Sequence, residues 1–378
     1  MTSILLVSLM SLAIIKAAPL IYGALCGLMS ERSGVVNIGI EGMMLTGAFM
    51  AFMGSALFSK WTGGVFNPNV SLVVGLLVGI ISAALVAGLH AILSIHYKID
   101  QVISGTVINL LAVGLTNYVA NAYIDPTHLS GVGVFPVWKI PLLSKIPILG
   151  PIFFEHQPMI YLMFALVLFL QYAIFNTPWG LRLRSVGEYP QAADSVGINV
   201  IKTRYLNVIL GGALAGLGGA IMVLESVGRF QKLMTSGRGF IALAVMIFGR
   251  WSPIGAFGAA ILFGFSEALG VRLQFGDINH LYALVVVAAL AVILTSIVWG
   301  INRLRNRSTK GKSPFLIGGI FTLGLTILYL ANQVEFPKVS VPIEFLGLLP
   351  YVLTIIVLTG LVKRAVGPAA VGKPYEKQ

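Results

Sequence analysis

Residues 71–95, SLVVGLLVGIISAALVAGLHAILSI, contain no Asp, Glu, Lys or Arg. A helix needs about 20 mostly apolar residues to cross the hydrocarbon layer of a membrane, so this stretch predicts one transmembrane helix. Similar stretches recur along almost the whole chain, and the complete set of predicted spans is 4–28, 42–58, 71–95, 101–119, 158–176, 205–227, 254–272, 281–299, 315–333 and 343–362. The sequence therefore predicts an all-α, polytopic integral membrane protein with about 9–11 transmembrane helices.

The composition of the 378-residue chain excludes the other broad classes of protein. Hydrophobic residues make up 57% of it, charged residues make up 10%, and the mean hydropathy is +0.93. A soluble domain carries roughly 25% charged residues, and a disordered chain is poor in apolar residues. We ascribe the net charge of +12 to basic cytoplasmic loops and not to nucleic-acid binding, because no basic run is interleaved with aromatic residues.

Basic residues gather in two loops and near the end of the chain, at 176–205, 302–313 and from 363 onward. The positive-inside rule assigns such loops to the cytoplasm, so we expect the proline-rich connection 120–158 on the outer side. These positions divide a single transmembrane domain, 1–378, into a first half (about 1–176), a cytoplasmic loop (177–204), a second half (about 205–362) and a cytoplasmic tail (363–378).

Two apolar segments, 35–44 and 240–248, are too short to cross a membrane alone. Each is flanked by glycine and charged residues, and each is followed by Gly-Ala-Phe, at 47–49 and 255–257. The pairing predicts an internal duplication with a broken helix in each half, a pattern that points to the translocation pathway of a transporter. Two ordinary glycine-rich packing helices would explain the same pattern, and both interpretations stay open.

Polar side chains within the predicted membrane segments are costly and usually face a cavity or a partner. Asn37 and Glu41 lie in the first short segment. We expect them either to line the translocation pathway or to fix the segment by capping and hydrogen bonding. Glu267 is expected to be structural, paired with Arg250 or Arg272, and is kept as a further candidate for the pathway.

The chain lacks the sequence patterns of enzymes and metal sites. Its histidines have no carboxylate or cysteine at ligand spacing, and no hydrolase, metalloprotease or nucleotide-binding motif is present. We therefore expect no catalytic site, no metal and no cofactor, and any ATP would be handled by another chain. The glycines at 211–219 lie in an apolar span without a basic residue, which predicts close helix packing.

Residues 178–199, PWGLRLRSVGEYPQAADSVGIN, form the most informative loop. Pro190 suits the first turn of a short helix, with Glu188 near the positive end of its dipole. We expect Ala192, Ala193 and Val196 to form one small apolar face that docks into a groove on another protein; a solvated linker is the alternative. Gly197 is expected to close the turn with a positive φ. The residues assigned to the docking segment are Gly187, Glu188, Pro190, Ala192, Ala193, Gly197 and Ile198.

Four stretches carry a resemblance to known proteins: SERSGVVNIGIEGMMLTGAFMAF at 30–52, the loop 178–199, GRWSPIGAF within 248–269, and GKPYE at 372–376. They resemble permease subunits of bacterial ABC importers for ribose and branched-chain amino acids, and most of all those of nucleoside importers served by basic-membrane-protein lipoproteins. The resemblance implies nucleoside import across the bacterial plasma membrane. It also implies an ABC ATPase subunit, a second homologous permease and a substrate-binding lipoprotein as partners, with 187–198 as the coupling helix against the ATPase.

The chain departs from the family pattern between Leu269 and the last predicted span, where two spans and the basic loop 302–313 are inserted. Within the family, a simple-sugar permease of the ribose type is the alternative function. Outside it, an ion-coupled secondary transporter would use Glu41, Glu267 and Lys16 as a relay, although such relays usually need more buried carboxylates.

Overall fold

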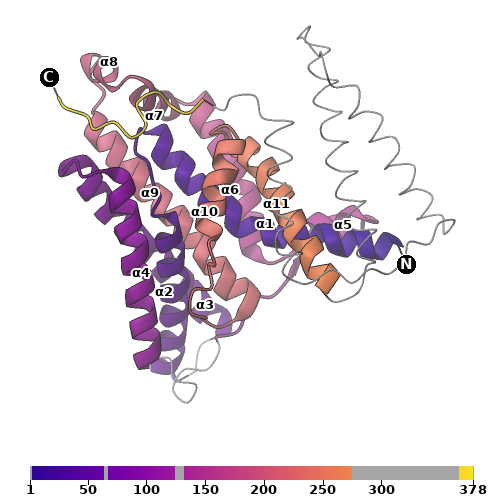
Figure 1. Cartoon of the computed structure of the whole chain (residues 1–378). Helices are drawn as coiled ribbons and strands as arrows, with labels where there is room; N and C mark the ends of the chain where they lie inside the picture. The colour runs from indigo at the N-terminus through magenta and orange to yellow at the C-terminus, as the bar shows by residue number, and fades with distance from the viewer. Residues whose placement is uncertain (1, 64–66, 124–131, 275–365, 378) are drawn as a thin grey trace, which may run out of the picture. The chain divides into compact units, whose positions relative to one another are not determined.

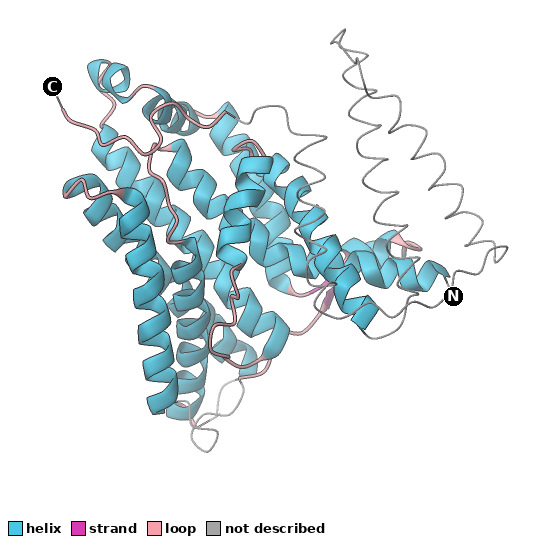
Figure 2. Cartoon of the chain, in the orientation of Figure 1, coloured by secondary structure: helices cyan, strands magenta, loops and turns pink. Residues whose placement is uncertain are grey.

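A computed structural model of the chain describes residues 2–63, 67–123, 132–274 and 366–377. Within them the fold is almost entirely helical, with one short pair of strands (Figure 2), which confirms the predicted all-α class. With the labels of Figure 1, the elements are α1 (Thr2–Arg32), α2 (Ile40–Trp61), α3 (Pro68–Ala91), α4 (Gln101–Tyr123), β1 (Trp138–Lys139), α5 (Leu149–Phe153), β2 (Glu155–His156), α6 (Pro158–Asn176), α7 (Pro178–Glu188), α8 (Pro190–Ser195), α9 (Val200–Ile221), α10 (Arg238–Phe248) and α11 (Pro253–Gln274). π-Helical turns extend α3 and α9, at Ile92–His96 and Met222–Val227, and a 3-10 turn covers Leu143–Lys145.

Seven helices in the described part of the chain are long and apolar enough to cross a membrane. They are Leu6–Arg32, Ile40–Trp61, Pro68–His96, Gln101–Tyr123, Pro158–Asn176, Val200–Val227 and Pro253–Arg272. Each overlaps one of the spans predicted between residues 4 and 272, so those seven predictions are confirmed as helices. The predicted spans 281–299, 315–333 and 343–362, and the basic loop 302–313, lie outside the described residues.

The chain forms two compact units. Of the described residues, 2–17, 146–152 and 261–274 belong to the first unit. The second unit contains all the others, including residues 18–32 of α1, the whole of α2 to α4 and α6 to α10, and residues 366–377.

The core of the second unit is built by α2, α3 and α9, which pack directly against one another. Their backbones touch at glycines. A Cβ on Gly47 of α2 would lie 2.7 Å from the Cα of Gly216 in α9, and a Cβ on Gly216 would lie 2.8 Å from the carbonyl oxygen of Gly79 in α3. Small residues allow this close approach, so the predicted packing role of the glycines at 211–219 is confirmed for Gly216.

The two short segments singled out in the sequence have different structures. Residues 33–39, named here the α1–α2 link, are non-helical, and α2 then continues unbroken from Ile40 to Trp61. The prediction that 35–44 is a separate short segment is therefore wrong in its second half, because those residues begin a full-length helix. The segment 240–248 does form a separate short helix, α10, between the non-helical residues 228–237 and a turn at 249–252.

Candidate functional site

Glu41 joins the starts of two helices that are distant in the sequence. It lies in the first turn of α2, is 8% exposed, and accepts hydrogen bonds from the backbone N–H groups of Gly237 (2.8 Å) and Gly239 (2.6 Å) at the start of α10. The first N–H groups of a helix have no partner within it and favour a negative charge. A Cβ on Gly239 would lie 2.5 Å from the Glu41 Cα, so this contact needs glycine. Glu41 thus has the geometry of a capping residue, and the helix that it caps is α10.

The backbone of the α1–α2 link is satisfied by side chains from α3 and α4. Gln101 accepts a 2.6 Å hydrogen bond from the N–H of Val36, and the His90 Nε2–H donates a 2.9 Å bond to the Val36 carbonyl. Asn109 donates a 3.0 Å bond from its side-chain amide to the Ile38 carbonyl. Buried non-helical backbone requires such partners. Sequence reasoning missed all three side chains, since no local pattern marks a residue that serves the backbone of a distant segment.

Asn37 lies in the α1–α2 link and is fully buried. Its amide group donates a 3.3 Å hydrogen bond to the hydroxyl of Ser30 and lies 3.6 Å from the sulfur of Cys26. Within the described residues its carbonyl oxygen has no hydrogen-bond partner. Asn37 therefore faces α1, whereas Glu41 reaches α10.

Glu267 of α11 and Lys16 of α1 form an ion pair within the first unit, with the Lys16 Nζ 3.3 Å from the carboxylate. Both side chains are about three-tenths exposed. Glu267 is thus paired with Lys16, whereas the sequence predicted Arg250 or Arg272 as its partner. The two residues are 251 positions apart, so no local sequence pattern predicts that they form an ion pair.

The loop between α6 and α9 forms two short helices, α7 and α8. Pro190 is the first residue of α8, as predicted, and Gly197 after it has a φ of +83°. The predicted apolar face is wrong. Ala193 is 3% exposed and packs inside the chain, whereas Ala192 and Val196 point outward, Val196 with 74% of its surface exposed. In a helix of less than two turns, tertiary packing decides which side chains face inward.

Ala193 belongs to a small apolar cluster with Val186 of α7 and Val200 of α9. Ile198 and Tyr375 pack against this cluster. The α7–α8 pair is therefore supported from within by the chain itself, and part of that support comes from residues near the end of the sequence.

Gly187 and Glu188, at the end of α7, also contact these late residues. The carbonyl of Gly187 accepts a 2.9 Å hydrogen bond from the N–H of Ala370, and the carboxylate of Glu188 accepts a 3.1 Å bond from the N–H of Ala369. A Cβ on Gly187 would overlap the carbonyl oxygen of Arg32. The carboxylate of Glu188 thus binds residues 366–377, a contact that the sequence did not predict.

Two titratable groups of residues 366–377 have shifted pKa values. The hydrogen bond and charge of Lys98 lower the pKa of Glu376, whose carboxylate lies 2.5 Å from the Lys98 Nζ. Partial desolvation, and then a hydrogen bond donated to Asp194, raise the pKa of the Tyr375 phenol. Glu376 is therefore ionised at neutral pH and pairs with the loop between α3 and α4.

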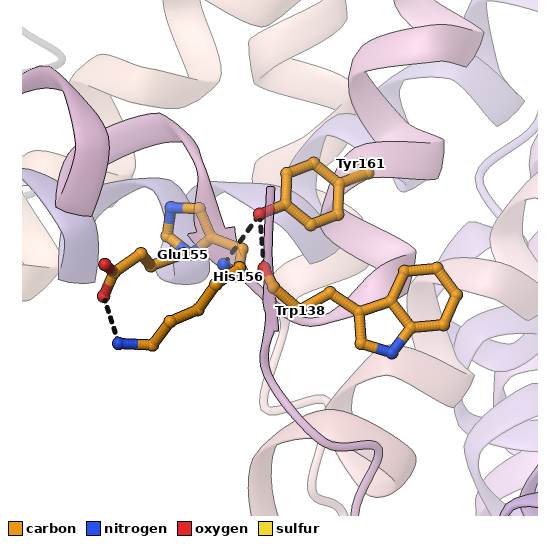
Figure 3. A network of polar contacts seen from close by, with 5 residues as sticks. Trp138, Glu155, His156 and Tyr161 are labelled. Atoms are coloured by element: carbon orange, nitrogen blue, oxygen red, sulfur yellow. Dashed lines mark hydrogen bonds and ion pairs between the residues drawn. The ribbon is translucent and has the colours of Figure 1, made fainter. Parts of the chain in front are cut away.

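A polar network orders the start of α6 within the predicted outer connection (Figure 3). Strands β1 and β2 pair antiparallel, with Trp138 opposite His156. The hydroxyl of Tyr161 donates a 2.8 Å hydrogen bond to the Trp138 carbonyl and accepts a 3.0 Å bond from the His156 N–H, and Lys139 forms a 3.2 Å ion pair with Glu155. The short strands were not predicted, since two residues carry no periodicity.

The buried carboxylate of Glu225 ties the same region to the end of α9. It accepts a 2.6 Å hydrogen bond from the N–H of Met159, and the hydroxyl of Tyr22 in α1 donates a 2.7 Å bond to the Met159 carbonyl. Among the described residues no group of three or more His, Cys, Asp or Glu side chains is placed to hold a metal ion.

The seven apolar helices of the described residues, joined by loops and the short helix α10, define a polytopic membrane protein. The family described as "Branched-chain amino acid transport system / permease component" matches residues 9–295. The chain belongs to this family. It is a multi-pass protein of the plasma membrane and a translocation subunit of a transporter.

Three relatives show how far the similarity extends. The guanosine ABC transporter permease protein NupQ of Bacillus subtilis (strain 168) is 36% identical over 369 residues, covering 96% of this chain and 95% of the relative. The nucleoside ABC transporter permease protein NupC of Lactococcus lactis subsp. cremoris is 41% identical over 262 residues, covering 68% of this chain and 80% of the relative. The putative glucose ABC transporter permease protein TsgC13 of Haloferax volcanii is 33% identical over 338 residues, covering 88% and 94%. No solved structure matches the chain.

Proposed function

We propose that this chain is the membrane-spanning subunit of an ATP-driven importer of nucleosides. The observation that carries the proposal is the similarity to the guanosine permease of Bacillus subtilis, which extends over 96% of this chain and 95% of the relative. The similarity to the nucleoside permease of Lactococcus lactis, at 41% identity, supports the same substrate class. The putative glucose permease at 33% identity makes simple sugars the second candidate.

We propose that an ABC ATPase subunit docks on the outer face of α8, on the cytoplasmic side that the basic residues of loop 177–204 favour. Tyr189, Ala192 and Val196 are exposed there, and small and apolar groups allow close approach of a partner. In this arrangement Gly187, Pro190 and Ala193, which are buried, support the docking face from behind, and Gly197 and Ile198 complete the turn into α9.

A second, homologous permease would lie beside this chain in the membrane and complete the membrane-spanning part of the importer. The guanosine ABC transporter permease protein NupP of Bacillus subtilis is also similar to this chain, at 27% identity over 293 residues. Two different permeases of one organism are thus similar to it, which supports pairing of unlike subunits. An extracytoplasmic lipoprotein would deliver the substrate to the outer connection that β1 and β2 order.

The contacts of the buried polar residues favour ATP-driven transport over an ion relay. The carboxylates of Glu41 and Glu267 are engaged by backbone N–H groups and by Lys16, respectively. A relay needs carboxylates that exchange protons, so both residues are assigned to holding the fold. Asn37, whose carbonyl oxygen has no partner among the described residues, is the candidate for the translocation pathway.

Transport by the purified permease with its ATPase and binding protein in liposomes tests the function. We expect ATP-dependent uptake of labelled nucleosides, and guanosine should compete for that uptake. Uptake of glucose or ribose without nucleosides would favour the sugar function, and uptake that follows a proton gradient without ATP would contradict the ABC mechanism. Shortening the outer connection 120–158 tests delivery: stimulation by the binding protein should fall while assembly with the ATPase is kept.

A further inference from the structure

Residues 366–376 cross the ends of several helices that are far apart in the sequence. They are named here the tail strap. In Figure 1 this segment, in yellow, runs past α7, α8 and the start of α9. Hydrogen bonds and an ion pair join it to α7, to the α1–α2 link, to α9 and to the loop between α3 and α4. The strap thus contacts both the proposed docking helices and the segment that leads to Glu41.

Most of these attachments involve the backbone of the strap. The N–H groups of Ala369 and Ala370 donate to Glu188 and Gly187 of α7, and the N–H of Gly372 donates a 3.2 Å hydrogen bond to the Gly34 carbonyl in the α1–α2 link. Hydrogen bonds between backbone groups transmit a displacement directly. Contacts between long exposed side chains transmit less of it, because the side chains can rotate. One short segment therefore holds the end of α7 and the start of the link in a fixed relation.

Arg204 of α9 lies beneath the strap and is 2% exposed. Its Nη1 donates a 3.1 Å hydrogen bond to the Lys373 carbonyl. Its Nη2 packs against Gly34 so closely that a Cβ added to Gly34 would lie 2.8 Å from it. The Nε and Nη2 atoms have no hydrogen-bond partner within the described residues. A buried guanidinium is costly unless it is hydrogen-bonded, so release of the strap would leave this charge without its carbonyl partner. The strap is therefore held in place by the interior of the permease.

Tyr375 forms the contact between the strap and the docking helices. Its ring packs on the apolar cluster of Val186, Ala193 and Val200, and its hydroxyl interacts with Asp194 of α8. The outer face of α8, with Ala192 and Val196, is left exposed. The strap thus backs α8 on the side opposite the face on which a partner would dock.

We propose that the tail strap is a positioning element that transmits displacement of α7 and α8 to the α1–α2 link. This inference rests on the proposed function, since it takes the ATPase as the partner that moves α8. The link continues directly into the first turn of α2, where Glu41 holds the start of α10. A push on α8 would reach that contact through Tyr375, the backbone of residues 369–372 and Gly34.

The test separates docking from transmission by changing Tyr375, which faces inward. Tyr375→Ala should leave co-purification with the ATPase unchanged, because the exposed face of α8 is intact, while substrate-stimulated ATP hydrolysis and uptake fall about tenfold, within the usual range of coupling between sites. Lys377→Ala is the matched control, since it removes an exposed side chain two positions further along, and should behave as the wild type. Tyr375→Phe should retain most transport because it keeps the packing.

Three outcomes would overturn the inference. Tyr375→Ala could transport as well as Lys377→Ala, which would make the strap a passive segment. It could lose the ATPase, which would make the strap part of the docking surface. Finally, a Lys98→Cys/Glu376→Cys pair, joined by a thiol crosslinker, should keep transport if the strap works while attached; a block relieved by cleaving the crosslinker would identify a latch that must open. Failure of the wild type itself to couple uptake to ATP would instead overturn the proposed function.

Discussion

The carbonyl of Gly187 accepts a hydrogen bond from the N–H of Ala370, and the two residues are brought together although 183 positions separate them. This bond fixes the end of α7 against the tail strap at the point where α7 turns into α8. Because Gly187 also packs on the Arg32 carbonyl, the backbones of α1, α7 and the tail strap meet there.

The two glycines that border α8 should respond differently to alanine. Gly187→Ala places a methyl group against the Arg32 carbonyl, and overpacking of this kind typically costs about 1–3 kcal/mol of stability. Gly197→Ala meets no neighbouring atom within 4 Å, but Gly197 has a φ of +83°, so its cost should be only that of the left-handed conformation, about 1–2 kcal/mol. Gly197→Asn should cost less than Gly197→Ala, because asparagine tolerates that conformation. Thermal unfolding of the purified permease measures all three; equal effects of alanine and asparagine at 197 would contradict the conformational argument.

Substitutions at Ala193 and Val196 should separate stability from docking. Ala193→Arg inserts a charge into the cluster with Val186 and Val200 and should destabilise the permease itself. Val196→Arg changes a side chain that is 74% exposed and should leave stability within about 0.5 kcal/mol while weakening co-purification of the ATPase. A stable Val196→Arg permease that still couples fully to the ATPase would show that this face of α8 is not the docking surface.

Glu41 should tolerate neither of two standard replacements fully. Glu41→Ala leaves the N–H groups of Gly237 and Gly239 without a partner, at about 1–3 kcal/mol for each buried group. Glu41→Gln keeps one acceptor and turns an amide NH2 toward the other N–H, so its loss of stability should be smaller. Glu155→Gln, which removes one partner of the ion pair with Lys139, is the control and should change stability by about 0–1 kcal/mol. Variants of Glu41 that stay as stable as the wild type yet do not transport would show that the charge itself serves translocation.

Tyr161→Phe should loosen the outer connection and leave the membrane core intact. It removes the hydroxyl that bonds both the Trp138 carbonyl and the His156 N–H. The Trp138 carbonyl is exposed enough to be hydrated, so the loss of stability should be about 0.5–1.5 kcal/mol. Hydrogen exchange of residues 138–156 should increase, and stimulation of uptake by the binding protein should fall. Unchanged stimulation would argue against this connection as the site of delivery.

The attachment of Glu376 to Lys98 should depend on pH in one direction. Because Lys98 lowers the pKa of Glu376 below its usual 4.5, the pairing contributes to docking of the strap above that value and is lost as the pH falls through the lowered pKa. Limited proteolysis after residue 370 should therefore be constant at neutral pH and increase only in acid. In Glu376→Gln the acid-induced increase should be absent; an increase near neutral pH would point to a different group.

Much of the membrane architecture could be predicted because it depends on composition along short windows. Each of the seven described spans is a run of apolar residues, and α10 is recognisable as one that is too short. Pro190 and Gly197 were predictable for a similar reason, since they restrict the backbone locally. The inward orientation of Ala193 could not be predicted, because packing against Val186, Val200 and Tyr375 orients the six-residue helix α8.

The partners of the buried charges could not be predicted either. Glu41 meets Gly239 and Lys16 meets Glu267 only through the tertiary fold, and neither pair shares a local pattern. The side chains of His90, Gln101 and Asn109 bond to backbone in the α1–α2 link, which a sequence describes only as a gap between helices. A single sequence holds no record of such long-range pairing.

The contact between Glu41 and α10 has a consequence for biogenesis. Gly239 is 198 positions after Glu41, so at a synthesis rate of about 5–20 residues per second the acceptor is made roughly 10–40 s before its donors. During that interval α2 enters the membrane with a carboxylate in its first turn that lacks these two partners, and an unpaired charge is costly to bury. The nascent first half must therefore shelter this group, through polar contacts of its own or by delayed release from the insertion machinery, until the second half arrives.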